Sequence, residues 1–174
     1  MTSDELKKLI RDIPDFPKPG ILFYDITPLI ADARGLAAIV DQMAEPWLGK
    51  IDVVLGIESR GFIIGAPVAY RLGVGLAIAR KPGKLPFRTI DETYDLEYGS
   101  ASLQIHEDGV PSGSRILIAD DLLATGGTAR AAIRLAERLG GKVVGCTFVI
   151  ELDALKGRDL LAPIGSTALV HYEL

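Results

Sequence analysis

The chain has 174 residues, of which 48% are hydrophobic, and its formal net charge at pH 7 is -4. This length and composition predict a single domain over residues 1–174 with a sizeable core. The negative charge supplies no overall positive field for nucleic acid or an anionic membrane surface, so we expect neither as a partner.

The N-terminal part of the chain combines helical patterns with a proline-rich loop. Residues 4–12 place apolar side chains at helical spacing, with Thr2 or Ser3 available as cap and Pro14 as the end of the segment. Acidic residues interrupt the apolar ones, which is not typical of a signal peptide, and no apolar run in the chain is long enough to span a membrane. We therefore expect a cytoplasmic protein. A loop over residues 14–30 follows, and a second helical pattern covers 33–48.

Strand and helix patterns alternate through the rest of the chain. Apolar runs that predict buried strands occupy residues 51–58, 74–80, 114–120 and 143–150, and helical patterns occupy 59–73 and 128–141. The single cysteine, Cys146, lies in the last of these strands, where a buried and unreactive thiol is expected. The alternation predicts an α/β fold with a central, mostly parallel sheet flanked by helices. In such sheets, ligands bind at the carboxyl ends of the strands.

One long interval interrupts this alternation. Residues from Lys81 to about 102 are polar, charged and punctuated by Pro82, Gly83 and Pro86. Segments of this length inside compact domains are usually lids or binding loops. We expect a long flexible lid loop over about residues 81–102; the alternatives are a solvated β-hairpin and a disordered insertion.

The stretch ILIADDLLATGGTA, residues 116–129, joins a predicted strand to a predicted helix. Gly126 and Gly127 allow turns in which consecutive amides converge on a phosphate at the helix N-terminus, and Thr125 and Thr128 add hydroxyl donors. No lysine follows the glycines, which favours one phosphate monoester over a triphosphate chain.

Two carboxylates, Asp120 and Asp121, stand directly before this loop. Carboxylates accept hydrogen bonds from hydroxyl groups, so a ribose 5-phosphate fits both the acids and the glycine-rich loop. The alternative is structural: the acids cap a turn that the glycines permit.

An apolar strand, two acids and a TGGT loop, in this order, closely resemble the phosphoribosyl pyrophosphate motif of type I phosphoribosyltransferases. Four further segments agree in order, namely DFPKPGILFYDITPL, GIESRGFIIGAPVA, RKPGKLP and TYDLEYG. The resemblance covers nearly the whole chain and is strongest to members of the family that act on adenine. It implies the type I phosphoribosyltransferase fold, with an N-terminal hood-like arm over about residues 1–35 and the lid described above.

The resemblance also implies an enzyme. It would transfer the phosphoribosyl group from phosphoribosyl pyrophosphate to adenine, giving AMP and pyrophosphate in purine salvage, and it would be a homodimer like most of the family. Mg²⁺ would arrive with the pyrophosphate substrate. No metal held by the protein is expected, since His106 and His171 form no cluster with acids or cysteine at metal-ligand spacing. Two alternatives are a transferase for another base, such as hypoxanthine or guanine, and a non-catalytic sensor of phosphoribosyl pyrophosphate.

Carried over to this chain, the resemblance assigns four sets of residues. For the 5′-phosphate and ribose they are Asp120, Asp121, Ala124, Thr125, Gly126, Gly127 and Thr128. For pyrophosphate they are Glu58, Ser59, Arg60, Arg80 and Lys84, in a loop that often contains a cis peptide in the family. For adenine they are Leu22, Phe23 and Tyr24, although many relatives have arginine where Tyr24 stands. The catalytic set is Glu97, Arg60 and Tyr98, with Glu97 as general acid or base.

Overall fold

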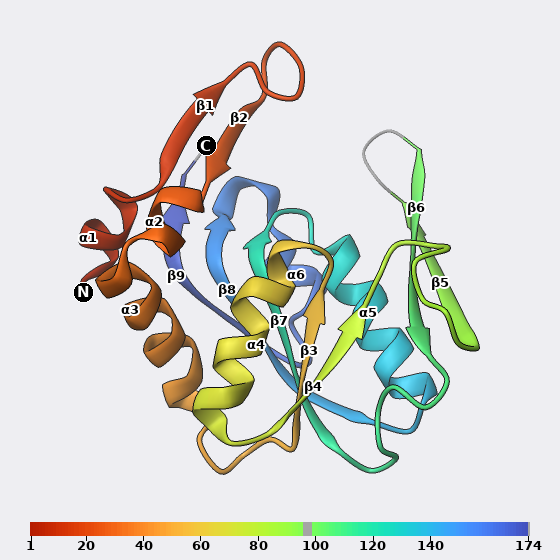
Figure 1. Ribbon diagram of the computed structural model, residues 1–174. Helices are drawn as coiled ribbons and strands as arrows, with labels where there is room; N and C mark the ends of the chain where they lie inside the picture. The colour runs from red at the N-terminus through yellow and green to blue at the C-terminus, as the bar shows by residue number, and fades with distance from the viewer. Residues whose placement is uncertain (96–98, 174) are drawn as a thin grey trace.

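The computed structural model describes residues 1–95 and 99–173. Its largest sheet has five strands in the order β4-β3-β7-β8-β9, all parallel (Figure 1). Their bounds are β3 (Val53–Ile57), β4 (Gly75–Ala79), β7 (Arg115–Leu123), β8 (Lys142–Leu152) and β9 (Ser166–Tyr172). The predicted parallel α/β fold is confirmed, while β9 is a strand that the sequence patterns did not predict.

Helices cover both faces of this sheet. The helices α3 (Ala33–Ala44) and α4 (Arg60–Leu72) lie on one face and α5 (Gly127–Arg138) on the other (Figure 1). Alternate residues of β3 divide between the two layers: Leu55 and Ile57 belong to the cluster that contains α5, and Val54 belongs to the cluster that contains α4. This burial on both sides explains why the strand is apolar throughout. Three short helical segments follow strands or helices of this layer structure: η1 (Glu45–Trp47) comes after α3, and η2 (Asp153–Leu155) and α6 (Gly157–Leu160) come after β8.

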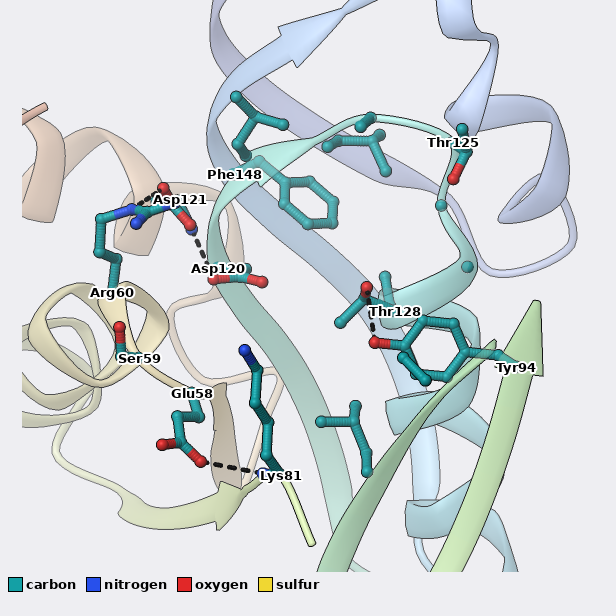
Figure 2. Close-up of a pocket in the computed structure, with 18 of the residues that line it drawn as sticks. Glu58, Ser59, Arg60, Lys81, Tyr94, Asp120, Asp121, Thr125, Thr128 and Phe148 are labelled. Carbon is teal, nitrogen blue, oxygen red and sulfur yellow. Dashed lines mark hydrogen bonds and ion pairs between the residues drawn. The ribbon is translucent and has the colours of Figure 1, made fainter. Parts of the chain in front are cut away.

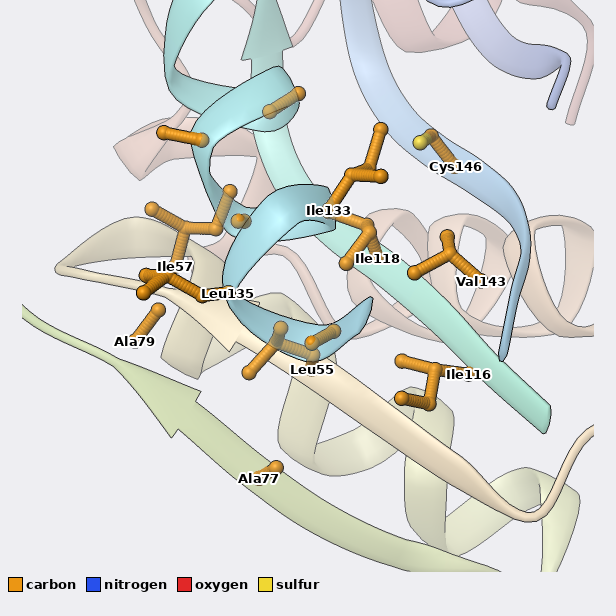
Figure 3. Packing of buried hydrophobic residues seen from close by; sticks show 14 of the residues in the cluster. Leu55, Ile57, Ala77, Ala79, Ile116, Ile118, Ile133, Leu135, Val143 and Cys146 are labelled. Atoms are coloured by element: carbon orange, nitrogen blue, oxygen red, sulfur yellow. The ribbon is translucent and has the colours of Figure 1, made fainter. Parts of the chain in front are cut away.

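The core beneath α5 is built from aliphatic side chains (Figure 3). Ile133 and Leu135 of α5 and Ile116 and Ile118 of β7 are fully buried within it. Cys146 lies in the same cluster, and burial raises the pKa of its thiol to about 12. The predicted burial of the thiol is confirmed, and a pKa this high disfavours the reactive thiolate.

The N-terminal segment differs from the prediction. The helix α1 spans only Ser3–Lys7, capped by Thr2, so the helix predicted over residues 4–12 is wrong beyond its first turn or so. Strand β1 (Arg11–Pro14) pairs instead with β2 (Leu22–Asp25) as an antiparallel ribbon. The pairing joins residues about ten positions apart, which helical spacing cannot reveal. A short helix, α2 (Thr27–Ala31), then leads into α3.

The segment predicted as a lid loop contains a β-hairpin, which was the alternative reading. Strands β5 (Thr89–Asp95) and β6 (Ser100–His106) pair antiparallel from Thr89 opposite His106 to Asp95 opposite Ser100. Ion pairs join Glu92 to Arg134 at 3.0 Å and to Arg138 at 3.2 Å, which anchors the hairpin on α5. Figure 1 shows the hairpin and the β1-β2 ribbon on opposite sides of the carboxyl ends of the sheet strands. Closure of the hairpin as a lid stays a prediction.

Within residues 1–95 and 99–173, no helix is both long enough and apolar enough to cross a membrane.

Candidate active site

A pocket of about 650 Å³ lies at the carboxyl ends of β3 and β7, where parallel sheets bind ligands (Figure 2). Three regions distant in sequence meet there: the loop after β3, the loop after β7, and the start of the long segment that contains the hairpin. The pocket is lined by Glu58, Ser59, Arg60, Lys81, Lys84, Tyr94, Ala101, Leu103, Phe148 and residues 120–129. The structure thus brings the predicted phosphate, ribose and pyrophosphate residues to one cavity. Arg80 is the exception: it does not line the cavity, but it forms an ion pair with Glu58, which does.

We refer to residues 124–128 as the phosphate loop. Gly126 has φ +85°, in the left-handed region, and it forms the N-cap of α5 without a side-chain capping bond. No acidic residue occupies the first turn of α5, so its N-terminal amides remain available to an anion. Thr128 donates a hydrogen bond from Oγ1 to the hydroxyl oxygen of Tyr94 at 3.1 Å, which ties the loop to β5 (Figure 2). A left-handed glycine at a helix N-terminus without first-turn acids fits the predicted phosphate binding, which stays a prediction.

The two acids of the motif have different environments. Asp121 is 6% exposed and forms an ion pair with Arg60. Asp120 is half-buried in the pocket, and its Oδ1 accepts a hydrogen bond from the Asp121 backbone at 2.9 Å. Burial, followed by the negative charge of Asp121, raises the pKa of Asp120 well above its usual value. In the residues that the structure describes, Asp120 is the one pocket carboxylate without an ion pair.

A glycine lets helix α4 approach these acids closely. A Cβ atom at Gly61 would lie 2.8 Å from Oδ1 of Asp120 and 2.9 Å from the carbonyl oxygen of Ala119. Any larger residue would push the start of α4 away from β7. Arg60, the first residue of α4, reaches Asp121 because of this contact, and its guanidinium also lies 5.4 Å from the centre of the Phe23 ring.

Glu58 organises the basic side of the pocket. Its carboxylate forms ion pairs with Arg80 at 3.2 Å and Lys84 at 3.1 Å, and it accepts a hydrogen bond from the Lys81 backbone at 2.9 Å. Burial alone would raise the pKa of Glu58, but these hydrogen bonds outweigh it and lower the pKa to about 2. An anion repels pyrophosphate, so we expect Glu58 to orient the cations rather than to contact the ligand. The peptide bond between Glu58 and Ser59 is cis.

The residues predicted to bind adenine lie on β2, outside the set that lines the pocket. Leu22 is 39% exposed and Phe23 is half-buried. Tyr24 is 5% exposed and stacks on Tyr172, with ring centres 3.8 Å apart. The Tyr24 side chain therefore packs against β9, and base binding by this segment stays a prediction. Glu97 and Tyr98, the two predicted catalytic residues of the hairpin segment, lie outside the described residues.

Several residues that line the pocket were not predicted as site residues, among them Lys81, Tyr94 and Phe148. Lys81 points its ammonium group into the pocket toward Asp120 (Figure 2). In the sequence, Lys81 stands out only as a further positive charge between Arg80 and Lys84. Tyr94 stands within the motif TYDLEYG, whose family resemblance was the available signal. Phe148 sits in an apolar strand and gave no signal of its own.

A second polar cluster lies at the ends of β8 and β9. Glu151, Asp153 and His171 bring one ligand atom each within 4.8 Å of one another. The expectation that His171 forms no cluster with acids is therefore wrong, because parallel strands place residues 20 positions apart side by side. Arg158 already pairs with Glu151, and Nδ1 of His171 lies 2.8 Å from Asp153.

The strand, two-acid motif and phosphate loop on a parallel sheet define a phosphoribosyl-transferring class of protein, and comparison with known proteins agrees. The chain matches the family described as "Phosphoribosyl transferase domain" over residues 23–162 and belongs to that family. The earlier resemblance is thereby confirmed.

Similar proteins are, more particularly, adenine phosphoribosyltransferases. One from Acidobacterium capsulatum is 55% identical over 170 residues, covering 97% of this chain and 94% of the relative. The crystal structure of the enzyme of that name from Thermoanaerobacter pseudethanolicus is 49% identical with a TM-score of 0.95, covering 98% of this chain and 100% of the other. The structure from Saccharomyces cerevisiae, complexed with an imino-altritol bisphosphate and adenine, is 40% identical with a TM-score of 0.85, covering 97% and 96%.

Proposed function

We propose that this protein transfers the phosphoribosyl group of phosphoribosyl pyrophosphate to adenine, releasing AMP and pyrophosphate. The observation that carries the proposal is the pocket in which the phosphate loop, the acid pair and the Glu58 cluster converge. Similarity to adenine phosphoribosyltransferases along nearly the whole chain supports adenine as the acceptor.

The two sides of the pocket suit the two ends of the donor. The phosphate loop would hold the 5′-phosphate through amides and hydroxyls, and Asp120 and Asp121 would accept hydrogen bonds from the ribose hydroxyls. Across the pocket, Arg60, Lys81 and Lys84 would face the pyrophosphate. This places positive charge where the leaving group becomes more negative as the glycosidic bond breaks. In this arrangement the acids would lie near the ribose, whose anomeric carbon becomes more positive in the same step.

The pocket also fits a substrate-borne magnesium ion. Mg²⁺ retains several waters and usually binds one or two carboxylates together with substrate phosphates. Asp120, as a carboxylate without a cationic partner among the described pocket residues, is the residue that would contact such an ion. Bound with the pyrophosphate, Mg²⁺ would neutralise charge on the leaving group.

One assay tests the proposed reaction. The purified protein is incubated with phosphoribosyl pyrophosphate, Mg²⁺ and adenine, hypoxanthine or guanine in separate reactions, and the nucleotide formed is measured. We expect AMP from adenine at a rate far above that of either other nucleotide. A preference for hypoxanthine or guanine would reassign the base. Binding of the donor without product from any base would favour a sensor.

We propose that Glu97 acts as general acid or base on the purine. Glu97→Gln keeps the size of the side chain and removes its titration, so kcat should fall by about 100-fold, within the usual range for proton transfer. Glu107→Gln, on an exposed residue after β6, is the matched control and should leave kcat unchanged. Steady-state assays with adenine provide the measurement. Equal kcat in the Glu97 variant and the unmodified protein would remove this role and leave the overall reaction standing.

We also propose a homodimer that uses the surface around α4 and the edge strand β4. Ile63 and Tyr70, seven residues apart on one face of α4, are 49% and 89% exposed, and the adjacent Leu76 of β4 is 40% exposed. Clustered apolar exposure of this kind is typical of interfaces. Sedimentation velocity should give twice the chain mass, and Tyr70→Asp should shift the protein toward the monomer. A cytoplasmic location stays a prediction from the sequence.

A further inference from the structure

The phosphate loop rests on a second backbone segment, which comes from α6. Gly157, the first residue of α6, is buried, and a Cβ atom there would lie 2.2 Å from the carbonyl oxygen of Ala124 and 3.0 Å from the amide nitrogen of Gly126. Conversely, a Cβ atom at Gly126 would lie 2.8 Å from the carbonyl oxygen of Gly157. The two backbones are in direct contact, so a shift of α6 would require the loop to shift with it.

The helix α6 cannot fix its own position. It has four residues, too few for a helix to be stable by itself, and it follows Lys156, whose φ of +53° lies in the left-handed region. Tertiary contacts must therefore hold it. Leu161, directly after α6, is fully buried and supplies one apolar contact.

The polar contact that holds α6 comes from Arg158, next to Gly157. Nε of Arg158 donates to Oε1 of Glu151 at 3.0 Å, and Nη1 donates to the backbone oxygen of Ser166 at 2.8 Å. A second bond joins the guanidinium to Oε2 of Glu151, which makes the contact bidentate. Glu151 stands on β8 with 4% of its side chain exposed, and Ser166 begins β9. Arg158 thus attaches α6 to two strands of the central sheet.

The charge on Glu151 makes this attachment specific. A buried carboxylate needs a well-placed partner, and the planar guanidinium satisfies both of its oxygens, which an ammonium group cannot do in the same geometry. The other cationic candidate among the described neighbours is His171, whose Nδ1 lies 3.9 Å from Glu151 and is already bound to Asp153 at 2.8 Å.

We propose that Arg158 and Glu151 are positioning residues for 5′-phosphate binding: their ion pair holds the Gly157 backbone against Ala124 and Gly126 and so keeps the amides of the phosphate loop convergent. The inference rests on the proposed function for the identity of the phosphate ester. Neither side chain lines the pocket, so the effect passes through backbone contact. Pyrophosphate is expected on the opposite side of the pocket, near Arg60 and Lys84. Its affinity should therefore not change when the Arg158–Glu151 pair is removed.

Binding measurements separate local positioning from general stability. Isothermal titration calorimetry with Mg²⁺ gives the dissociation constants of ribose 5-phosphate and of pyrophosphate separately. For Arg158→Met we expect about tenfold weaker ribose 5-phosphate binding, since small misplacements of binding groups have effects of this order, and pyrophosphate binding within about twofold of the unmodified protein. Arg158→Lys should recover part of the loss. Arg71→Met removes an exposed ion pair with Asp41, 2.8 Å long, and as matched control should change neither constant.

The double variant Glu151→Gln with Arg158→Gln removes the buried charge together with its partner, so it serves if Arg158→Met does not fold. It should show the same selective loss. Equal weakening of both ligands, or unchanged ribose 5-phosphate affinity, overturns the inference. Binding of ribose 5-phosphate can be measured without turnover. If the protein binds ribose 5-phosphate but makes no AMP, the proposed reaction is wrong, and the role of the Arg158–Glu151 pair can still be tested. No binding of ribose 5-phosphate by the unmodified protein would overturn both.

Discussion

Gly126→Ala should raise the KM for phosphoribosyl pyrophosphate by up to about 100-fold. The added Cβ would meet the carbonyl oxygen of Gly157 at 2.8 Å, and backbone atoms cannot move aside as a flexible side chain would. The loop would have to shift, and misplacement of about 1 Å among groups that hold a substrate costs up to about 100-fold. Steady-state kinetics with the donor varied at saturating adenine measure the effect.

Gly113→Ala is the matched control for this variant. Gly113 has φ +81°, close to the +85° of Gly126, but a Cβ atom there would meet nothing within 4 Å. Both variants place alanine in the left-handed region, at a cost of about 1–2 kcal/mol in the free energy of unfolding. Gly126→Ala adds the clash with Gly157 to this shared cost, so it should be destabilised at least as much as Gly113→Ala in urea titrations, and only Gly126→Ala should lose donor affinity. A similar rise in KM for both would attribute the effect to backbone strain and contradict the role of the Gly157 contact.

The central sheet could be predicted from the sequence because its signals are local. A strand buried on both faces is apolar at every position, as β3 shows, and the alternation with helices fixes the parallel arrangement. The phosphate loop was predictable for the same reason. Its glycines, hydroxyls and acids are adjacent in the chain, and their chemistry points to one kind of ligand.

The missed features all depend on contacts between distant segments. The pairing of β1 with β2 replaces a helical pattern, and the pairing of β8 with β9 brings His171 to Glu151. The family resemblance assigns Glu58 to pyrophosphate, which stays a prediction; the sequence does not indicate that the fold surrounds this carboxylate with cations. The support of the phosphate loop by Gly157 joins residues about 30 positions apart, and no local pattern at either glycine indicates it.

Asp120→Asn should lower kcat/KM by about 10- to 100-fold and yet stabilise the protein at neutral pH. The functional loss follows from the weaker hydrogen bonds that a neutral amide accepts from ribose hydroxyls, since a bond to a charged group contributes about 1.5–3 kcal/mol and a bond between neutral groups about 0.5–1.5 kcal/mol. The gain in stability follows from the pKa of Asp120, which burial and then the charge of Asp121 raise well above the usual value. The Tm of Asp120→Asn should therefore exceed that of the unmodified protein; in a chain of this size each kcal/mol gained in the free energy of unfolding raises the Tm by roughly 2–4 °C.

Because the pKa of Asp120 is raised in the folded protein, the stability gained by Asp120→Asn should depend on pH. A carboxyl group with a raised pKa in the folded state binds its proton more tightly than in the unfolded chain, so stability falls as pH rises from about 4 toward the folded-state pKa. Asparagine has no such titration. The difference in Tm between Asp120→Asn and the unmodified protein should therefore be smallest near pH 4 and should widen toward pH 8, as scanning calorimetry at both pH values would show. Asp121→Asn should behave in the opposite way at neutral pH, because it leaves Arg60 without its ion-pair partner. If both asparagine variants lowered the Tm at pH 8, the charge on Asp120 would be stabilising. The assignment of Asp120, as the acid with a raised pKa, to the sugar and of Asp121 to the ion pair with Arg60 would then be wrong.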